Sequence, residues 1–221
     1  MIEAIVYDFD GVIVDSEPLH YRSFLRVVEP MGIRFSYETY MRHYIGFDDR
    51  DGFRAMAADH GVELGEARLT ELIEAKARAF EQVVADGIEP FPGVRELIEA
   101  TAKAMPIAIC SGALRSDIDA ILPAVLENGY ADWFKAIVTA DDVARSKPDP
   151  QSYALACERL GVSPASALAI EDTPTGLMSA RDAGMRTLAV TNTWPAEELT
   201  DADHVVHSLA ELDVDSLRKL G

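Results

Sequence analysis

The chain has 221 residues, 48% of them hydrophobic, and a formal net charge of −18. This composition is typical of a globular protein with one sizeable core and room for a smaller second module. The negative charge argues against nucleic acid and anionic membranes as partners, because both would be repelled. No apolar stretch approaches the roughly 20 residues that span a bilayer, and the amino terminus lacks the basic region of a secretory signal. We therefore expect a cytoplasmic protein, in which Cys110 and Cys157 are buried free thiols.

The first predicted element is a short buried strand over residues 2–6, and it leads into two aspartates, Asp8 and Asp10. Side chains two residues apart in extended chain point to the same side. Two such carboxylates repel each other, by about 4 kcal/mol at roughly 4 Å if the effective dielectric is near 20. The pair therefore predicts a positively charged group or ion at the end of this strand.

The next segment, residues 15–86, interrupts the strand pattern. It carries helical periodicity over 21–28, 51–60 and 68–84 and no convincing strand. The stiff sequence PFPG at 90–93 then marks the return to strands and helices. We predict an all-helical cap domain, residues 15–86, inserted after the first strand of a core domain formed by residues 1–14 and 87–221.

Helices and strands alternate through the rest of the chain. The helical patterns span residues 94–104, 114–122 and 151–160 and run through residues 177 and 183. The strand patterns span residues 106–110, 136–140, 167–170 and 187–190. Strands separated by helices of this length predict a parallel sheet built from right-handed βαβ units. The expected fold class is α/β: a Rossmann-like parallel sheet with helices on both faces, plus the inserted α-helical cap.

Chemically active side chains follow four of the predicted strands. In chain order they are Asp8 and Asp10, then Ser111, then Lys147, then Glu171 and Asp172. Ligands bind at the carboxyl ends of the strands in open parallel sheets, so we expect these residues to converge. Carboxylates with open positions suit Mg²⁺ together with a substrate phosphate. The set therefore predicts phosphoryl chemistry, with the lysine offsetting part of the negative charge.

The same residues suggest a covalent mechanism. Asp8 would attack phosphorus in line and form an aspartyl-phosphate. Asp10 would protonate the leaving oxygen and later deprotonate water. The hydroxyl of Ser111, with the amide of Gly112 alongside, would donate to a phosphate oxygen.

Four sequence segments, DFDGVIVDSEPLH, the Ser111 loop, SKPDP and IEDTPTG, occur in this order. Together they resemble the haloacid dehalogenase superfamily, and within it the β-phosphoglucomutase-like sugar phosphatases with a small helical cap. The resemblance implies Asp8 as nucleophile and Asp10 as general acid/base. It also implies Mg²⁺ on Asp8, the Asp10 backbone carbonyl and Asp172, with Glu171 as an auxiliary ligand. The serine and lysine of the second and third segments would hold the transferring phosphate.

Two other chemistries of this superfamily fit the residues poorly. Its dehalogenases need no metal and lack the second aspartate, whereas Asp10, Glu171 and Asp172 are all present here. Its phosphonate-cleaving members also lack that aspartate and use a cap lysine as a Schiff base. Lys76 lies in the predicted cap, but the presence of Asp10 disfavours this activity.

The main alternative to a phosphatase is β-phosphoglucomutase. By resemblance, mutases hold a second phosphate with a cap arginine and a basic run after the second-segment serine. Here the arginine position is Asp49, and Arg115 is the one candidate cation in that run. His20 and Lys76 match mutase positions, but phosphatase relatives carry similar residues. Because each missing charge-assisted bond removes roughly 1.5–3 kcal/mol, we favour a phosphatase.

The predicted function is that of a Mg²⁺-dependent phosphomonoesterase acting on a small phosphate ester, and we expect a sugar phosphate. The cap would exclude water and select the substrate, with residues 47–50, including Asp48 and Arg50, forming a loop that faces the site. No obligate protein partner is expected. A catalytically silent metabolite-binding protein is a remote alternative, disfavoured because every residue that the chemistry needs is present.

Overall fold

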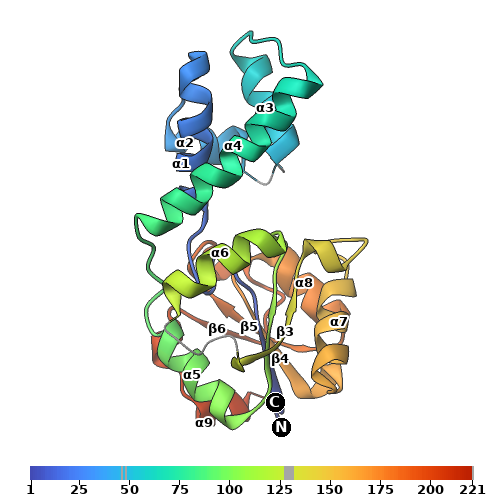
Figure 1. Ribbon diagram of the computed structural model, residues 1–221. Helices are drawn as coiled ribbons and strands as arrows, with labels where there is room; N and C mark the ends of the chain where they lie inside the picture. Colours follow the sequence, from blue (N-terminus) through green and yellow to red (C-terminus); the bar gives the residue numbers. More distant parts are fainter. Residues whose placement is uncertain (46, 48, 127–131, 221) are drawn as a thin grey trace. The chain divides into compact units, whose positions relative to one another are not determined.

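The computed structural model describes residues 1–45, 47, 49–126 and 132–220. The chain forms two compact units. One consists of Met1–Asp15 together with Ile88–Gly221, and the other of Ser16–Gly87. Within the described residues, every strand lies in the first unit, whereas the second is built from helices (Figure 1).

The first unit contains a six-stranded sheet in the order β3-β2-β1-β4-β5-β6, and all neighbouring strands are parallel. The strands are β1 (Ala4–Tyr7), β2 (Ile107–Cys110), β3 (Phe134–Val138), β4 (Ala167–Glu171), β5 (Arg186–Val190) and β6 (His204–Val206). The chain moves outward from β1 to β3 and then returns to β4 on the other side of β1. Parallel sheets bind ligands where the winding reverses in this way, so the β1–β4 pair marks the expected site.

Helices cover both faces of the sheet. They are α5 (Val94–Ala104), α6 (Arg115–Val125), α7 (Gln151–Leu160), α8 (Pro174–Asp182) and α9 (Val214–Lys219). In Figure 1, α5, α6 and α9 lie on one side of the strands, and α7 and α8 on the other. Right-handed crossovers produce this distribution, because the winding direction changes after β3.

The central strands β1, β2 and β4 are buried along their whole length. Strands covered on both faces read as near-continuous apolar runs, which is why the sequence shows them clearly. On the α7 face the strands contribute alanines and valines, among them Ala4, Ala108 and Ala169, beneath Tyr153 and Cys157 of the helix. These small side chains give the larger residues of α7 room to pack on the sheet.

The second unit contains α1 (Glu17–Val28), α2 (Tyr37–His43), α3 (Asp49–Asp59) and α4 (Glu66–Ala85). It has an aromatic and aliphatic core of its own, which includes Phe24, Phe53, Met56, Leu69 and Leu72. Interdigitated side chains of this kind let a small helical unit bury apolar area independently of the sheet.

The predicted fold class is confirmed, and several element boundaries need correction. Strand β3 occupies Phe134–Val138 and not the predicted 136–140. The prediction began too late because β3 is an edge strand, in which exposed Lys135 interrupts the apolar pattern. Helix α1 begins at Glu17, before the predicted start, since Pro18 fits the first turn of a helix. No sequence pattern predicted α2, β6 or α9, which are short.

The structure also describes the two cysteines and the apolar character of the helices. Cys110 and Cys157 are free and buried, as expected. Burial raises the pKa of the Cys110 thiol to about 12 and that of Cys157 to about 11. Among the described residues, no helix combines the length and the apolar character that crossing a membrane requires.

Candidate active site

The loop after β1 carries the first two predicted site residues. The Asp8 amide donates to the Ile170 carbonyl of β4 at 2.9 Å, which brings the Asp8 side chain to the β1–β4 edge. Asp8 is buried and Asp10 is half-buried. The chain then turns at Gly11, whose φ of 82° lies in the left-handed region that favours glycine. A Cβ at Gly11 would also collide with the Asp172 carboxylate, so this turn requires glycine twice over.

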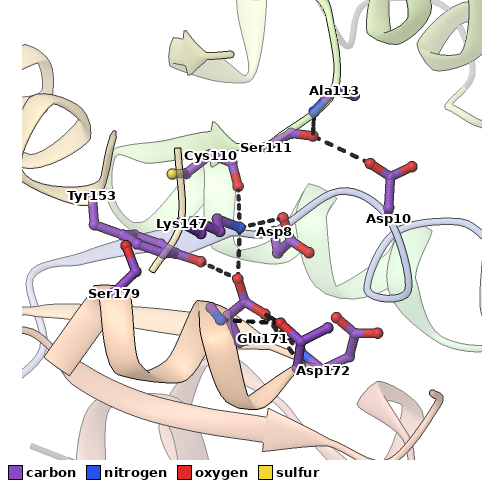
Figure 2. A network of polar contacts seen from close by, with 12 residues as sticks. Asp8, Asp10, Cys110, Ser111, Ala113, Lys147, Tyr153, Glu171, Asp172 and Ser179 are labelled. Atoms are coloured by element: carbon purple, nitrogen blue, oxygen red, sulfur yellow. Dashed lines mark hydrogen bonds and ion pairs between the residues drawn. The ribbon is translucent and has the colours of Figure 1, made fainter. Parts of the chain in front are cut away.

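Lys147 supplies the positive charge that the sequence predicted beside Asp8. Its Nζ donates to Asp8 Oδ1 at 2.6 Å, to Glu171 Oε1 at 2.6 Å and to the Cys110 carbonyl at 3.0 Å (Figure 2). Burial alone would lower the pKa of Lys147, but the adjacent Asp8 and Glu171 carboxylates outweigh burial and hold it well above its usual value. Lys147 is therefore a charged, three-way link between the ends of β1, β2 and β4.

Glu171 is fully buried, and protein donors satisfy its carboxylate. Besides Lys147, Tyr153 donates its hydroxyl to Oε1 at 2.8 Å. The Asp172 amide (3.1 Å), the Thr173 amide (3.3 Å) and the Thr173 hydroxyl (3.1 Å) donate to Oε2. Such a carboxylate holds its neighbours in place, because each oxygen already accepts at least two hydrogen bonds.

Asp172 differs from Glu171 in this respect. It is 1% exposed, and its Oδ1 has no hydrogen-bond partner in the described part of the chain. Burial, reinforced by the Glu171 charge, raises the pKa of Asp172 to about 7. Burial and the Glu171 charge likewise raise the pKa of Asp8 well above its ordinary value, although Lys147 opposes the shift. Among the described residues, the carboxylates of this site therefore carry more charge than the Lys147 ammonium offsets.

These carboxylates fit a divalent cation. Ligand atoms of Asp8, Glu171 and Asp172 all lie within 4.8 Å of one another. A buried carboxylate oxygen without a partner is costly unless something positive satisfies it, and Asp172 Oδ1 is such an atom. An all-oxygen donor set with more than one carboxylate suits Mg²⁺ better than a softer metal.

Ser111 connects the second predicted segment to Asp10. Its hydroxyl donates to Asp10 Oδ2 at 3.3 Å and accepts from the Ala113 amide at 2.9 Å (Figure 2). Ser111 is buried, whereas the neighbouring Gly112 is exposed and has open space around it. The structure thus brings six of the predicted residues to one sheet edge: Asp8, Asp10, Ser111, Lys147, Glu171 and Asp172.

Three predicted cap residues form a cluster within the helical unit. Lys76 is buried, and its Nζ donates to Asp49 Oδ1 at 2.6 Å and lies 3.1 Å from His20 Nδ1. The His20 ring stacks on Phe80 with 4.7 Å between centroids. Burial and the Lys76 charge lower the pKa of His20 to about 3. The imidazole is therefore neutral near pH 7, and its Nδ1 accepts from the ammonium.

The other two predicted substrate residues each pair with a carboxylate of their own unit. Arg50 donates to Glu66 at 3.1 Å, and Arg115 donates to Asp119 at 2.8 Å. Both arginines are exposed. Asp48, the remaining charged residue of the predicted loop at 47–50, lies outside the described residues.

Sequence reasoning missed three side chains at the sheet edge. Tyr153 looked like an ordinary core residue of its helix, and no pattern marked its hydroxyl. Asn192 and Thr193 follow β5, and Asn192 Nδ2 donates to the Gly11 carbonyl at 2.8 Å. The rule that found the other residues, polar side chains directly after a strand, would have found Asn192 and Thr193 as well.

Comparisons with known proteins agree with this arrangement. The family model of haloacid dehalogenase-like hydrolases matches residues 5–190. The chain is 32% identical to the protein CbbY of Rhodobacter capsulatus, over 84% of this chain and 83% of that one. It is 29% identical to the fructose-1-phosphate phosphatase YqaB of Escherichia coli, over 82% and 92% respectively.

Solved structures of CbbY from Rhodobacter sphaeroides resemble the whole chain. The complex with phosphate has a TM-score of 0.84 at 28% identity and covers 98% of this chain and 99% of that chain. A mutant in complex with xylulose-(1,5)bisphosphate has the same TM-score at 27% identity, with the same coverage. The predicted family is confirmed: the chain belongs to the haloacid dehalogenase-like hydrolases.

Proposed function

We propose that this hydrolase is a Mg²⁺-dependent phosphomonoesterase that acts on a small sugar phosphate through an aspartyl-phosphate on Asp8. One observation carries the proposal: buried Asp8, held by Lys147, lies beside Asp172, whose Oδ1 has no described partner. A nucleophile, a fixed cation and a place for a divalent metal thus share one sheet edge. The names of the relatives add support, since YqaB is a sugar-phosphate phosphatase and CbbY binds phosphate.

Asp8, Asp172 and the Asp10 backbone carbonyl would hold the metal. When bound, Mg²⁺ would offset the charge of the carboxylates and of the phosphate oxygens. Glu171 is near enough to contribute an oxygen, as the family resemblance implies. Its saturated hydrogen bonds favour an indirect role, in which it fixes Lys147 and the Asp172 backbone.

In this proposal each chemical step is assigned to one residue. The Asp8 carboxylate attacks phosphorus, the bond from phosphorus to the ester oxygen breaks, and the Asp10 carboxyl gives its proton to that oxygen. In the second half, Asp10 takes a proton from water, whose oxygen attacks phosphorus and frees Asp8. The hydrogen bond from Ser111 orients the Asp10 carboxyl before substrate binds. The Ser111 hydroxyl then donates to a phosphate oxygen of the substrate instead. Lys147 orients Asp8 and offsets the charge that builds up on the phosphoryl oxygens.

The paired cations favour a phosphatase over a mutase. Lys76 has its charge balanced by Asp49, Arg50 pairs with Glu66, and Arg115 pairs with Asp119. A second phosphate would have to displace a carboxylate from one of these cations. At buried Lys76 that sets one charge-assisted bond of roughly 1.5–3 kcal/mol against another. The exposed pairs of Arg50 and Arg115 each oppose it by less than about 1 kcal/mol. A hydroxyl-bearing substrate would face no such competition.

The direct test is inorganic phosphate release from a panel of small phosphate esters, with Mg²⁺ and with a chelator. The panel includes β-glucose 1-phosphate, with glucose 6-phosphate formation followed in the same samples. We expect metal-dependent phosphate release from one or a few sugar phosphates, lost in Asp8→Asn. Conversion of β-glucose 1-phosphate to glucose 6-phosphate with little free phosphate would identify a mutase instead. Tight binding of an ester without turnover would identify a silent binding protein.

A further inference from the structure

A fifth strand end reaches the site, although neither the sequence motifs nor the chemistry above assigns it a role. After β5 ends at Val190, Asn192 Nδ2 donates to the Gly11 carbonyl at 2.8 Å, across 181 residues of sequence. The hydroxyl of the next residue, Thr193, lies beside the Asp172 carboxylate, since both flank the position that a Gly11 Cβ would take, and it opposes the rise in the Asp172 pKa. Two adjacent side chains thus contact two separate parts of the site, the nucleophile loop and the acidic end of β4.

Gly11 shows how close these parts lie. A Cβ built on Gly11 would collide with Asp172 Oδ2 and would lie 2.8 Å from Thr193 Oγ1. The nucleophile loop, the Asp172 carboxylate and the Thr193 hydroxyl are therefore packed against one another, with no room for an extra methyl group. A small displacement of any one of them would move the other two.

The hydrogen bonds around Gly11 fix the direction of the Asp10 carbonyl. The Gly11 amide donates to the Val14 carbonyl at 2.8 Å. The Asp10 carbonyl and the Gly11 amide belong to one planar, trans peptide, so the hydrogen bond of the Gly11 amide also sets the direction of the Asp10 carbonyl. Asn192 holds the following peptide through the Gly11 carbonyl. Both peptide planes that flank the Gly11 Cα are therefore fixed.

We infer that Asn192 and Thr193 are positioning residues that hold the Asp10 carbonyl and the Asp172 carboxylate in the geometry that binds Mg²⁺. The inference rests on the metal site of the proposed function and assigns no metal contact to either residue. Partners that orient metal ligands typically change metal affinity about 10–100-fold when they are removed. The same contacts would matter only for folding if they merely anchored the loop after β5.

Substitutions of matched chemistry separate the two possibilities. Thr193→Val removes the hydroxyl at nearly constant volume, and Thr193→Ser keeps it. Asn192→Ala removes the donor to Gly11. Thr187→Val is the control, because Thr187 lies on β5 itself and its buried hydroxyl bonds Asp203 and the Asp201 carbonyl instead of the site. Isothermal titration of Mg²⁺ alone into the full chain gives the dissociation constant, and thermal unfolding without metal gives the stability.

We expect Thr193→Val and Asn192→Ala each to weaken Mg²⁺ binding about tenfold. Thr193→Ser should bind as the wild type does, and Thr187→Val should lose stability while keeping its Mg²⁺ affinity. Wild-type Mg²⁺ affinity in both Thr193→Val and Asn192→Ala would overturn the inference and leave the proposed function intact. A wild-type chain that binds no Mg²⁺ would overturn both. The expected pattern without phosphate release from any ester would support the inference and refute the phosphatase.

Discussion

Replacing Lys147 with methionine tests how the site balances its charge. The substitution keeps a long side chain and removes the ammonium that donates to Asp8 and Glu171, each at 2.6 Å. Removing one partner of a buried ion pair typically costs about 3–5 kcal/mol, because it leaves an uncompensated charge. Since Lys147 serves two buried carboxylates, we expect Lys147→Met to lower the free energy of unfolding by at least about 3 kcal/mol near pH 8 with metal chelated.

The pH dependence of this deficit follows from Asp8. Burial and Glu171 already raise the pKa of Asp8, and Lys147 opposes that shift, so its removal raises the pKa further. A carboxyl whose pKa is higher in the folded state stabilises the fold fully below its unfolded pKa. That contribution is lost as the pH rises through the folded pKa. The deficit of Lys147→Met relative to the wild type should therefore shrink as the pH falls from about 8 towards about 5.

Urea unfolding followed by tryptophan fluorescence suits this measurement, because both tryptophans, Trp133 and Trp194, lie in the unit that holds the sheet. Lys103→Met is the matched control: Lys103 lies 2.6 Å from Glu99, but the two side chains are 72% and 47% exposed. That pair should contribute less than about 1 kcal/mol. A Lys147→Met variant as stable as Lys103→Met near pH 8 would refute the argument from buried charge.

Three further predictions follow from the same contacts. Gly11→Ala should abolish phosphate release, because its Cβ would collide with Asp172. Gly61→Ala, also at positive φ but in open space, should cost only about 1–2 kcal/mol of stability. Equal phosphate release by the two variants would contradict this prediction. Asp49→Asn should free the Lys76 charge and raise kcat/KM for sugar bisphosphates relative to monophosphates about tenfold; an unchanged ratio would contradict it. Because the pKa of His20 is lowered to about 3, ¹⁵N NMR should show a neutral imidazole down to about pH 4. The contribution of His20 to the free energy of unfolding should fall as the pH drops below about 6.5, where the unfolded chain takes up the proton. Protonation of the folded-state imidazole near pH 6.5 would contradict this prediction.

The sequence predicted the sheet edge well because a simple rule governs it. Strands buried on both faces stand out as apolar runs, and in a parallel sheet their carboxyl ends meet. Asp8, Lys147 and Asp172 could therefore be expected near one another before any contact was known. The same reasoning fails for β6, whose three residues sit at the edge of the sheet and are only partly covered.

Individual partners were beyond this kind of reasoning. Nothing in the periodicity says that Tyr153 donates its hydroxyl to Glu171, or that Lys76 meets Asp49 across 27 residues of sequence. These contacts depend on how helices pack and which rotamers they allow, and one-dimensional patterns do not contain that information. The pairing of Lys76 bears on the proposed function, because the charge of a residue predicted to contact substrate is already balanced by Asp49.

The central claim is that Asp8 carries the phosphoryl group during turnover. The most direct measurement is rapid acid quenching of the enzyme during turnover of its best ester, followed by mass analysis of the peptide that contains Asp8. We expect one added phosphoryl group on that peptide in the wild type, and neither that group nor phosphate release in Asp8→Asn. Phosphate release by Asp8→Asn at the wild-type rate, with no added phosphoryl group on the wild-type peptide, would contradict a covalent role for Asp8.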